Sequence, residues 1–150
     1  MPVPPGFSEH HTPGDDARLL VDLLGDSSSW TDPEFADAVV ALDRLRSEID
    51  AAYAIAAARW DANAVWAGDG AQSGAGWLNT HGESTKISAR VLLKRGRTMR
   101  SCPAVTAAYR QGLIGTAKVD LLFTARKGCE TLFGEHEEGL VEQVRPLTVE

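Results

Sequence analysis

Apolar residues recur every three or four positions along most of this chain, which is the period of an α-helix. The clearest case follows Thr31, where a capping box formed with Glu34 and a proline at position 33 mark a helix start. From there one apolar stripe predicts a long helix over residues 32–67, about three times the mean helix length. We expect several other helices or a second chain to cover this stripe. It consists of Phe35, Val39, Leu42, Leu45, Ile49, Ala52, Ala56 and Trp60.

Several shorter helices surround the long one in this interpretation, and strand signals are nearly absent. Prolines at positions 2, 4, 5 and 13 predict a disordered tail over residues 1–13. The remainder, residues 14–150, is expected to form a single helical domain. The pattern therefore predicts an all-α fold, a multi-helix bundle with one long central helix. The shorter helices are predicted over residues 15–24, from Ser84 to about Arg100, from Pro103 to Gly112, over residues 116–127, and from Leu132 to Arg145 before Pro146.

Glycines at positions 68, 70, 74 and 76 interrupt the helical pattern. A glycine-rich segment can cradle phosphates, but here no strand precedes it and the GxxxxGK[ST] spacing is missing. We interpret it as a turn that leads into a helix start, with Trp77 and Leu78 returning the chain to the core.

Charge is sorted along the chain. Residues 84–127 contain ten basic residues and one acid, Asp120, whereas residues 1–83 and 128–150 are acidic. In the helix that begins near Ser84, the apolar set Ala89, Leu92, Gly96 and Met99 is expected inside. A basic stripe lies beside it, and a solvated helix face explains such a stripe as well as a nucleic-acid contact does. The candidate DNA-binding residues are Lys86, Arg90, Lys94, Arg97 and Arg100.

No catalytic or metal-binding constellation is recognisable, and no cofactor is expected. His10 and His11 fall in the tail, and His81 and His136 stand alone, so each is interpreted as a surface histidine. The two cysteines lack metal-site spacing, which favours free thiols in the cytoplasm. The longest strictly apolar run covers residues 51–58, too short to span a membrane, and we see no secretory signal.

A set of spaced residues forms a pattern between residues 70 and 118 of the chain. It consists of Gly70 to Ser73, Trp77-Leu78, Ser84, Ala89, Met99 to Pro103, Ala107, Gly112 to Ile114, and Ala117-Lys118. This set resembles the 13E12 repeat family of actinobacteria, also called domain of unknown function 222, and the resemblance covers about residues 35–150. The family pattern is Gly-x-x-Ser, Trp-Leu, Ser, Ala, Leu-x-x-Leu-Pro, Ala-Leu and Gly-x-Ile-Ser. The chain departs from it at Gly96, Cys102 and Gly115.

The resemblance implies a helical region that stands before an HNH endonuclease module. The histidines of this chain do not match an HNH site, which needs converging ligands on a ββα hairpin. We therefore expect a non-catalytic domain, truncated at its C-terminal end, that binds or positions DNA for a downstream HNH module. The alternatives are an assembly module, in which the long helix dimerises and the basic middle pairs with an acidic flank, and a nuclease in its own right.

Overall fold

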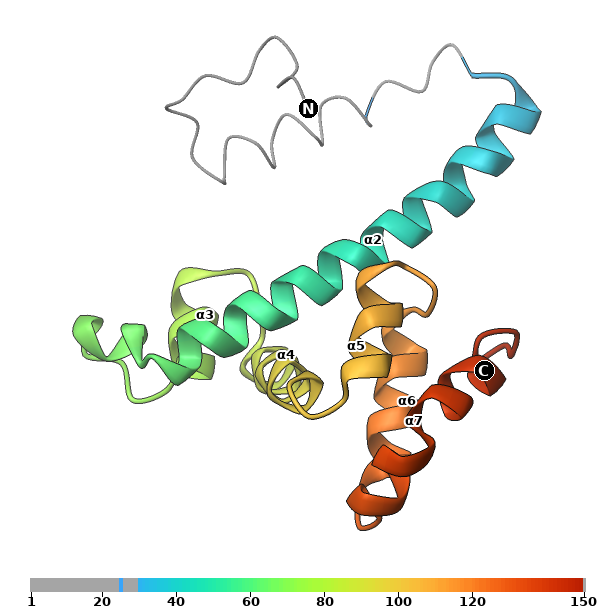
Figure 1. Cartoon of the computed structure of the whole chain (residues 1–150). Helices are drawn as coiled ribbons and strands as arrows, with labels where there is room; N and C mark the ends of the chain where they lie inside the picture. Colours follow the sequence, from blue (N-terminus) through green and yellow to red (C-terminus); the bar gives the residue numbers. More distant parts are fainter. Residues whose placement is uncertain (1–24, 26–29, 150) are drawn as a thin grey trace, which may run out of the picture. The chain divides into compact units, whose positions relative to one another are not determined.

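The structure, a computed structural model, describes residue 25 and residues 30–149. Every regular element in this part of the chain is a helix, which confirms the predicted all-α fold (Figure 1). The predicted tail over residues 1–13 and the predicted helix over residues 15–24 lie outside the described residues. The elements are α2 (Asp32–Ala62), the 3-10 helix η1 (Val65–Asp69), α3 (Gly74–His81), α4 (Lys86–Met99), α5 (Pro103–Arg110), α6 (Thr116–Arg126) and α7 (Glu130–Val144).

The chain divides into two compact units, residues 1–40 and residues 41–150, and the boundary falls within α2. In the first unit the Thr31 hydroxyl donates to the Glu34 carboxylate at 2.7 Å. The backbone N–H of Thr31 also donates to this carboxylate at 2.7 Å, which is one of the two hydrogen bonds of the predicted capping box. This hydrogen bond holds the pKa of Glu34 below its ordinary value. Trp30 packs edge to face on Phe35, with ring centroids 5.4 Å apart.

The long helix ends earlier than its sequence pattern predicts, at Ala62 rather than near residue 67. Ala64 adopts a left-handed conformation with φ 48°, which no α-helix accepts, and η1 follows. The indole N–H of Trp66 donates to the Asp61 carboxylate at 3.1 Å and holds this turn against the end of α2. The left-handed Ala64 therefore ends the helix, and the local hydrogen bond between Trp66 and Asp61 accompanies the turn.

Of the two covers expected for the large apolar stripe of α2, other helices or a second chain, the first is not found among residues 30–149. The buried face consists of small residues, and the large ones lie mainly on the opposite face, where Ile49 keeps 48% of its surface exposed. Small side chains are buried because another helix backbone comes too close for larger ones. The buried residues of α2 are Ser47, Ala51, Ala54, Ala57 and Ala58.

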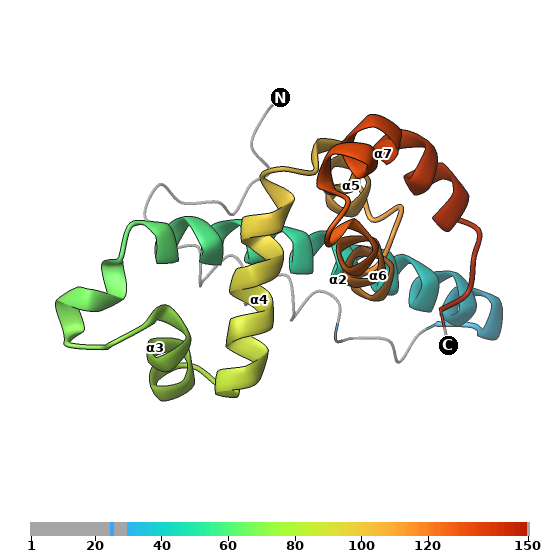
Figure 2. The same ribbon diagram turned by 90° about the horizontal axis from the view of Figure 1, so that it is seen from below.

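That neighbouring helix is α4, which crosses the C-terminal half of α2 (Figure 2). At Gly96 an added Cβ would lie 2.7 Å from the Cβ of Ala58 and would overlap the carbonyl oxygen of Ala54. Glycine is thus required here for close approach rather than for a special φ angle. The prediction that Ala89, Leu92, Gly96 and Met99 form the inner face of this helix is confirmed.

Helices α5, α6 and α7 pack together and complete the core of the second unit. The Tyr109 hydroxyl forms a 2.7 Å hydrogen bond with Thr116, whose hydroxyl donates to Asp50 of α2 at 2.9 Å. Burial raises the pKa of Tyr109, so it stays neutral near pH 7. Buried Glu137 of α7 accepts the N–H of Val105 at 2.8 Å and caps the start of α5.

Two predicted boundaries shift slightly. The N-cap of α4 is Thr85 rather than Ser84, because its hydroxyl accepts the N–H of Ser88 at 3.1 Å. Helix α7 begins at Glu130, two residues before the predicted start at Leu132. The turn before α3 is as predicted, with Ser73 as N-cap.

Two glycine substitutions, one at the crossing of α2 and α4 and one away from it, are expected to change the stability of the protein in opposite directions. Gly96→Ala is expected to destabilise the protein by about 1–3 kcal/mol, because the new methyl group overlaps α2. Gly134→Ala in α7 serves as the control, since nothing lies within 4 Å of its added Cβ. There the gain in helix propensity is expected to stabilise the protein by about 0.5–1 kcal/mol. Urea unfolding followed by circular dichroism measures both, and a neutral Gly96→Ala would contradict the packing described.

Candidate nucleic-acid interface

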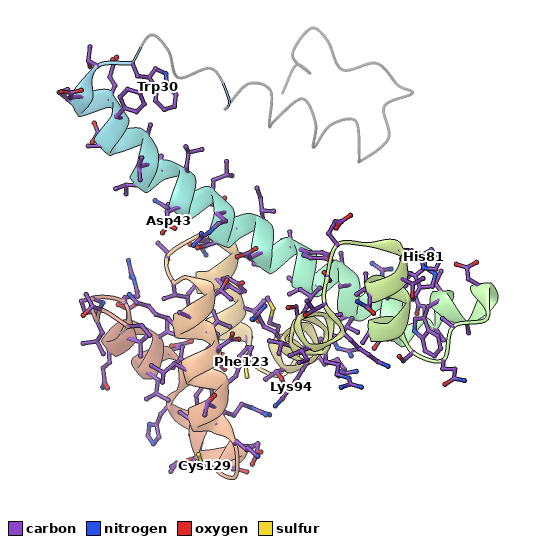
Figure 3. All side chains as sticks on the ribbon, turned by 180° about the vertical axis from the view of Figure 1, so that it is seen from behind. Trp30, Asp43, His81, Lys94, Phe123 and Cys129 are labelled. Carbon is purple, nitrogen blue, oxygen red and sulfur yellow. The ribbon has the colours of Figure 1, made fainter. Side chains whose placement is uncertain are left out.

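The five basic residues singled out from the sequence all lie exposed along or at the end of α4. Lys86, Arg90 and Lys94 follow one another at four-residue spacing, so they share one face of the helix. No acid interrupts α4. Figure 3 marks Lys94 on this helix. The stripe lies beside the buried face rather than opposite it, as the sequence pattern indicates.

Two arginines of this region are engaged inside the protein. Arg97 forms an ion pair with Asp61 of α2 at 3.2 Å, so part of its charge is neutralised. Arg95, which is not one of the five predicted DNA-binding residues, donates two 2.7 Å hydrogen bonds to Asp120 of α6. Only 11% of the Arg95 side chain is exposed, and the bidentate hydrogen bonds raise its pKa despite burial. Asp120 is the sole acid of the basic segment, and that isolation was the signal in the sequence that could have identified this pair.

The remaining stripe residues carry their charge toward solvent. Lys86, Arg90, Lys94 and Arg100 form no ion pair with any residue among 30–149. Within residues 30–149, the Arg97–Asp61 ion pair is therefore the single ion pair between the acidic flanks and this basic face. Point charges on flexible side chains suit the phosphates of a nucleic-acid backbone.

A cleft of about 560 Å³ opens between α4 and α6, next to the stripe. Lys94 lines one side, and Arg126 and Lys127 at the end of α6 line the other. Sequence analysis did not single out Arg126 or Lys127, because their approach to α4 depends on how the two helices pack. We refer to this feature as the α4–α6 cleft.

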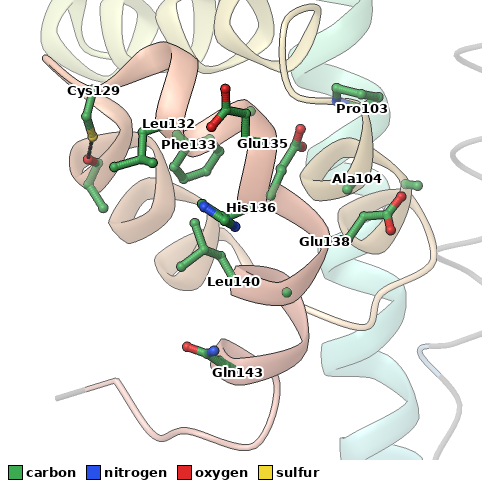
Figure 4. A pocket seen from close by; sticks show the side chains of 15 residues that line it. Pro103, Ala104, Cys129, Leu132, Phe133, Glu135, His136, Glu138, Leu140 and Gln143 are labelled. Atoms are coloured by element: carbon green, nitrogen blue, oxygen red, sulfur yellow. Dashed lines mark hydrogen bonds between the residues drawn. The ribbon is translucent and has the colours of Figure 1, made fainter.

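A larger cleft of about 1200 Å³ lies between α5 and α7 (Figure 4). Leu132, Phe133 and Leu140 supply much of its lining, with His136 beside them. The Cys129 thiol at one end donates to the carbonyl of Ala125 at 3.1 Å. This combination of an apolar wall and scattered polar groups defines no reaction chemistry.

The histidines within the described part of the chain do not converge. His81 stacks on Trp77 with ring centroids 4.3 Å apart, and its Nδ1 lies 3.1 Å from the Trp77 carbonyl oxygen. His136 lies on α7, and His10 and His11 fall outside the described residues. Over residues 30–149, no three histidine, cysteine or acidic side chains lie close enough together to hold a metal ion.

Both cysteines are free thiols. Cys102 is fully buried at the N-cap of α5, and burial raises the pKa of its thiol. Cys129 is exposed. A buried thiol with a raised pKa is a poor nucleophile, because the thiolate is the reactive form.

None of the helices between residues 30 and 149 is long and apolar enough to cross a membrane. Comparisons with protein-family models, curated proteins and solved structures find no match to this chain. The resemblance to the 13E12 family therefore stays a prediction.

Proposed function

We propose that this helical domain binds the sugar–phosphate backbone of duplex DNA through the exposed basic face of α4. The observation that carries the proposal is that four basic residues at this face have no acidic partner among residues 30–149. Arg97 contributes less, because Asp61 already neutralises part of its charge. The proposed contacts are Lys86, Arg90, Lys94 and Arg100, with a smaller contribution from Arg97.

Such binding is expected to be weak and nearly independent of sequence. Flexible point charges contact phosphates, whereas sequence is read through base edges in the grooves. The chain carries a net charge of −6, so its acidic flanks oppose DNA binding. The attraction between the basic face and the phosphates weakens as the salt concentration rises, so binding is expected mainly at low salt.

The resemblance to 13E12 proteins supports a place for this activity beside an HNH endonuclease module. In that arrangement the helical domain holds DNA in the cytoplasm, and the module supplies the metal and the histidine base. His81 and His136, the two histidines among residues 30–149, do not converge on a shared site that would support a nuclease activity of the chain's own.

DNA binding predicts a defined salt dependence. The four cations of α4 that pair with no acid among residues 30–149 contribute about −3.6 to the log–log salt slope for a 20-base-pair duplex, at about −0.9 per phosphate. The double substitution Lys86→Gln with Arg90→Gln is expected to flatten the slope by about 1.8, because two phosphate contacts are lost. Fluorescence anisotropy between 20 and 200 mM salt measures this.

The matched control replaces two exposed arginines of other helices, Arg59 and Arg110, by glutamine. It removes the same charge but no contact of α4, so it is expected to change the slope by less than half a unit. Absence of binding by the wild-type protein at 20 mM salt would contradict the proposal. An equal loss of binding in the control would contradict it as well.

We infer a second candidate function, self-association, from the outer face of α2. Ile49 and Tyr53 keep 48% and 45% of their surface exposed there, and Leu42, Ala56 and Trp60 follow the same helical spacing. An apolar stripe of this kind is typical of an interaction surface. Two-fold pairing of the same stripe is the simplest way to bury it.

Self-association predicts a particle of about twice the 16.1 kDa chain mass in multi-angle light scattering at micromolar concentration. Replacing Ile49 and Tyr53 by glutamate should shift it to the monomer without loss of helicity, because both positions are exposed. Leu121→Glu, at an equally exposed position of α6, is the control and should leave the mass unchanged. A wild-type monomer across the whole concentration range would contradict this function.

A further inference from the structure

The α4–α6 cleft is lined by four cationic side chains and two acidic ones. The two acids do not neutralise the cations equally, because the carboxylate of one acid already forms hydrogen bonds within the protein. Asp120 accepts both hydrogen bonds from Arg95, and this pair also fixes the spacing between the two helices. The pair thus forms a neutral, hydrogen-bonded part of the cleft wall.

The second acid, Glu130, is partly engaged by the backbone. Its carboxylate accepts the N–H of Gly128 at 3.2 Å. Hydrogen bonds from the backbone of Glu130 and Gly128, and to a lesser extent the charge of Arg126, hold the pKa of Glu130 below its ordinary value. Glu130 therefore stays ionised, and the three cations of the cleft outweigh it.

Those three cations come from separate elements. Lys94 belongs to α4, Arg126 ends α6, and Lys127 follows it. None of the three forms an ion pair with a residue in the described range 30–149. Phe123 lies on α6 near Lys94 in Figure 3 and gives the cleft an apolar, low-dielectric wall. Such walls focus the field of like charges and attract an anion from solution.

We propose that the α4–α6 cleft is a phosphate-binding site that seats one or two backbone phosphates of a polynucleotide. Lys94 belongs both to the stripe of α4 and to the cleft, so a strand that follows Lys86, Arg90 and Lys94 passes directly to Arg126 and Lys127. The proposal rests on the proposed DNA binding and adds a second helix to the contact surface.

The test compares two double variants of the full chain in the anisotropy experiment. Arg126→Gln with Lys127→Gln is expected to weaken duplex binding about tenfold or more at 50 mM salt and to flatten the salt slope by about 1.8. The conservative exchange Arg126→Lys with Lys127→Arg should retain most of the binding, because it preserves charge. Thermal melts of both variants establish that they remain folded.

The two proposals fail in different ways. Loss of binding in the Lys86 and Arg90 variant, together with wild-type affinity in the Arg126 and Lys127 variant, would overturn the cleft site and leave the proposed function intact. No binding by the wild-type protein would overturn both.

A further measurement distinguishes a polynucleotide from a free phosphorylated molecule as the occupant of the cleft. The melting temperature is measured in inorganic phosphate and in chloride at equal ionic strength, since a ligand that binds only the folded state raises it. A phosphate-specific rise that the Arg126 and Lys127 substitutions abolish, without any effect of these substitutions on DNA binding, would overturn the polynucleotide as the occupant. Weakened DNA binding with little effect of free phosphate is the result expected for a backbone contact.

Discussion

The close approach of α4 to α2 at Gly96 is the constraint on which the rest of the second unit depends. Because Gly96 has no side chain, α4 contacts the backbone of α2 at Ala54 and the methyl group of Ala58. This contact fixes which face of α4 is buried. Ala89, Leu92 and Met99 then turn inward, and the basic residues at neighbouring positions turn outward. The same rotation directs Arg95 sideways to Asp120 on α6.

Much of the fold can be predicted from sequence because its signals are local. The capping box at Thr31, Pro103 at the start of α5 and Gly112 with its positive φ angle each act within a few residues. The buried and exposed faces of α4 can be predicted from the helical period alone, because its apolar and basic residues lie on different sides of the helix. Local rules therefore suffice for these elements and for the exposure of the basic stripe.

The buried face of α2 could not be predicted in the same way. Periodicity gives weight to large apolar side chains, whereas here α4 lies so close to α2 at Gly96 that only small side chains such as Ala54 and Ala58 fit there. The turn that ends α2 at Ala62 contains a hydrogen bond from Trp66, and the α4–α6 cleft depends on an ion pair 25 residues apart in sequence. The ion pair arises from a contact between separate helices, and the hydrogen bond of Trp66, although local, is not signalled by the apolar period that predicts α2.

Electrostatics connects the fold with the proposed function. A basic segment between acidic flanks could have folded so that opposite charges met, and the assembly hypothesis required such pairing. In the described part of the chain only Arg97 meets an acid of the N-terminal flank, and Arg95 meets the acid of its own segment. The other cations of α4 form no ion pair with residues 30–149, and exposed ion pairs contribute little to stability. The proposed DNA contact relies on these cations.

The most direct test of this account is a titration of the ¹⁵N-labelled full chain with a short DNA duplex at 20 mM salt, followed by amide chemical shifts. The account predicts that the largest changes fall on α4 at Lys86, Arg90 and Lys94 and on the end of α6 at Arg126 and Lys127. Changes spread evenly over the chain, or centred on the acidic helix α7, would contradict it, and so would a spectrum that DNA leaves unchanged.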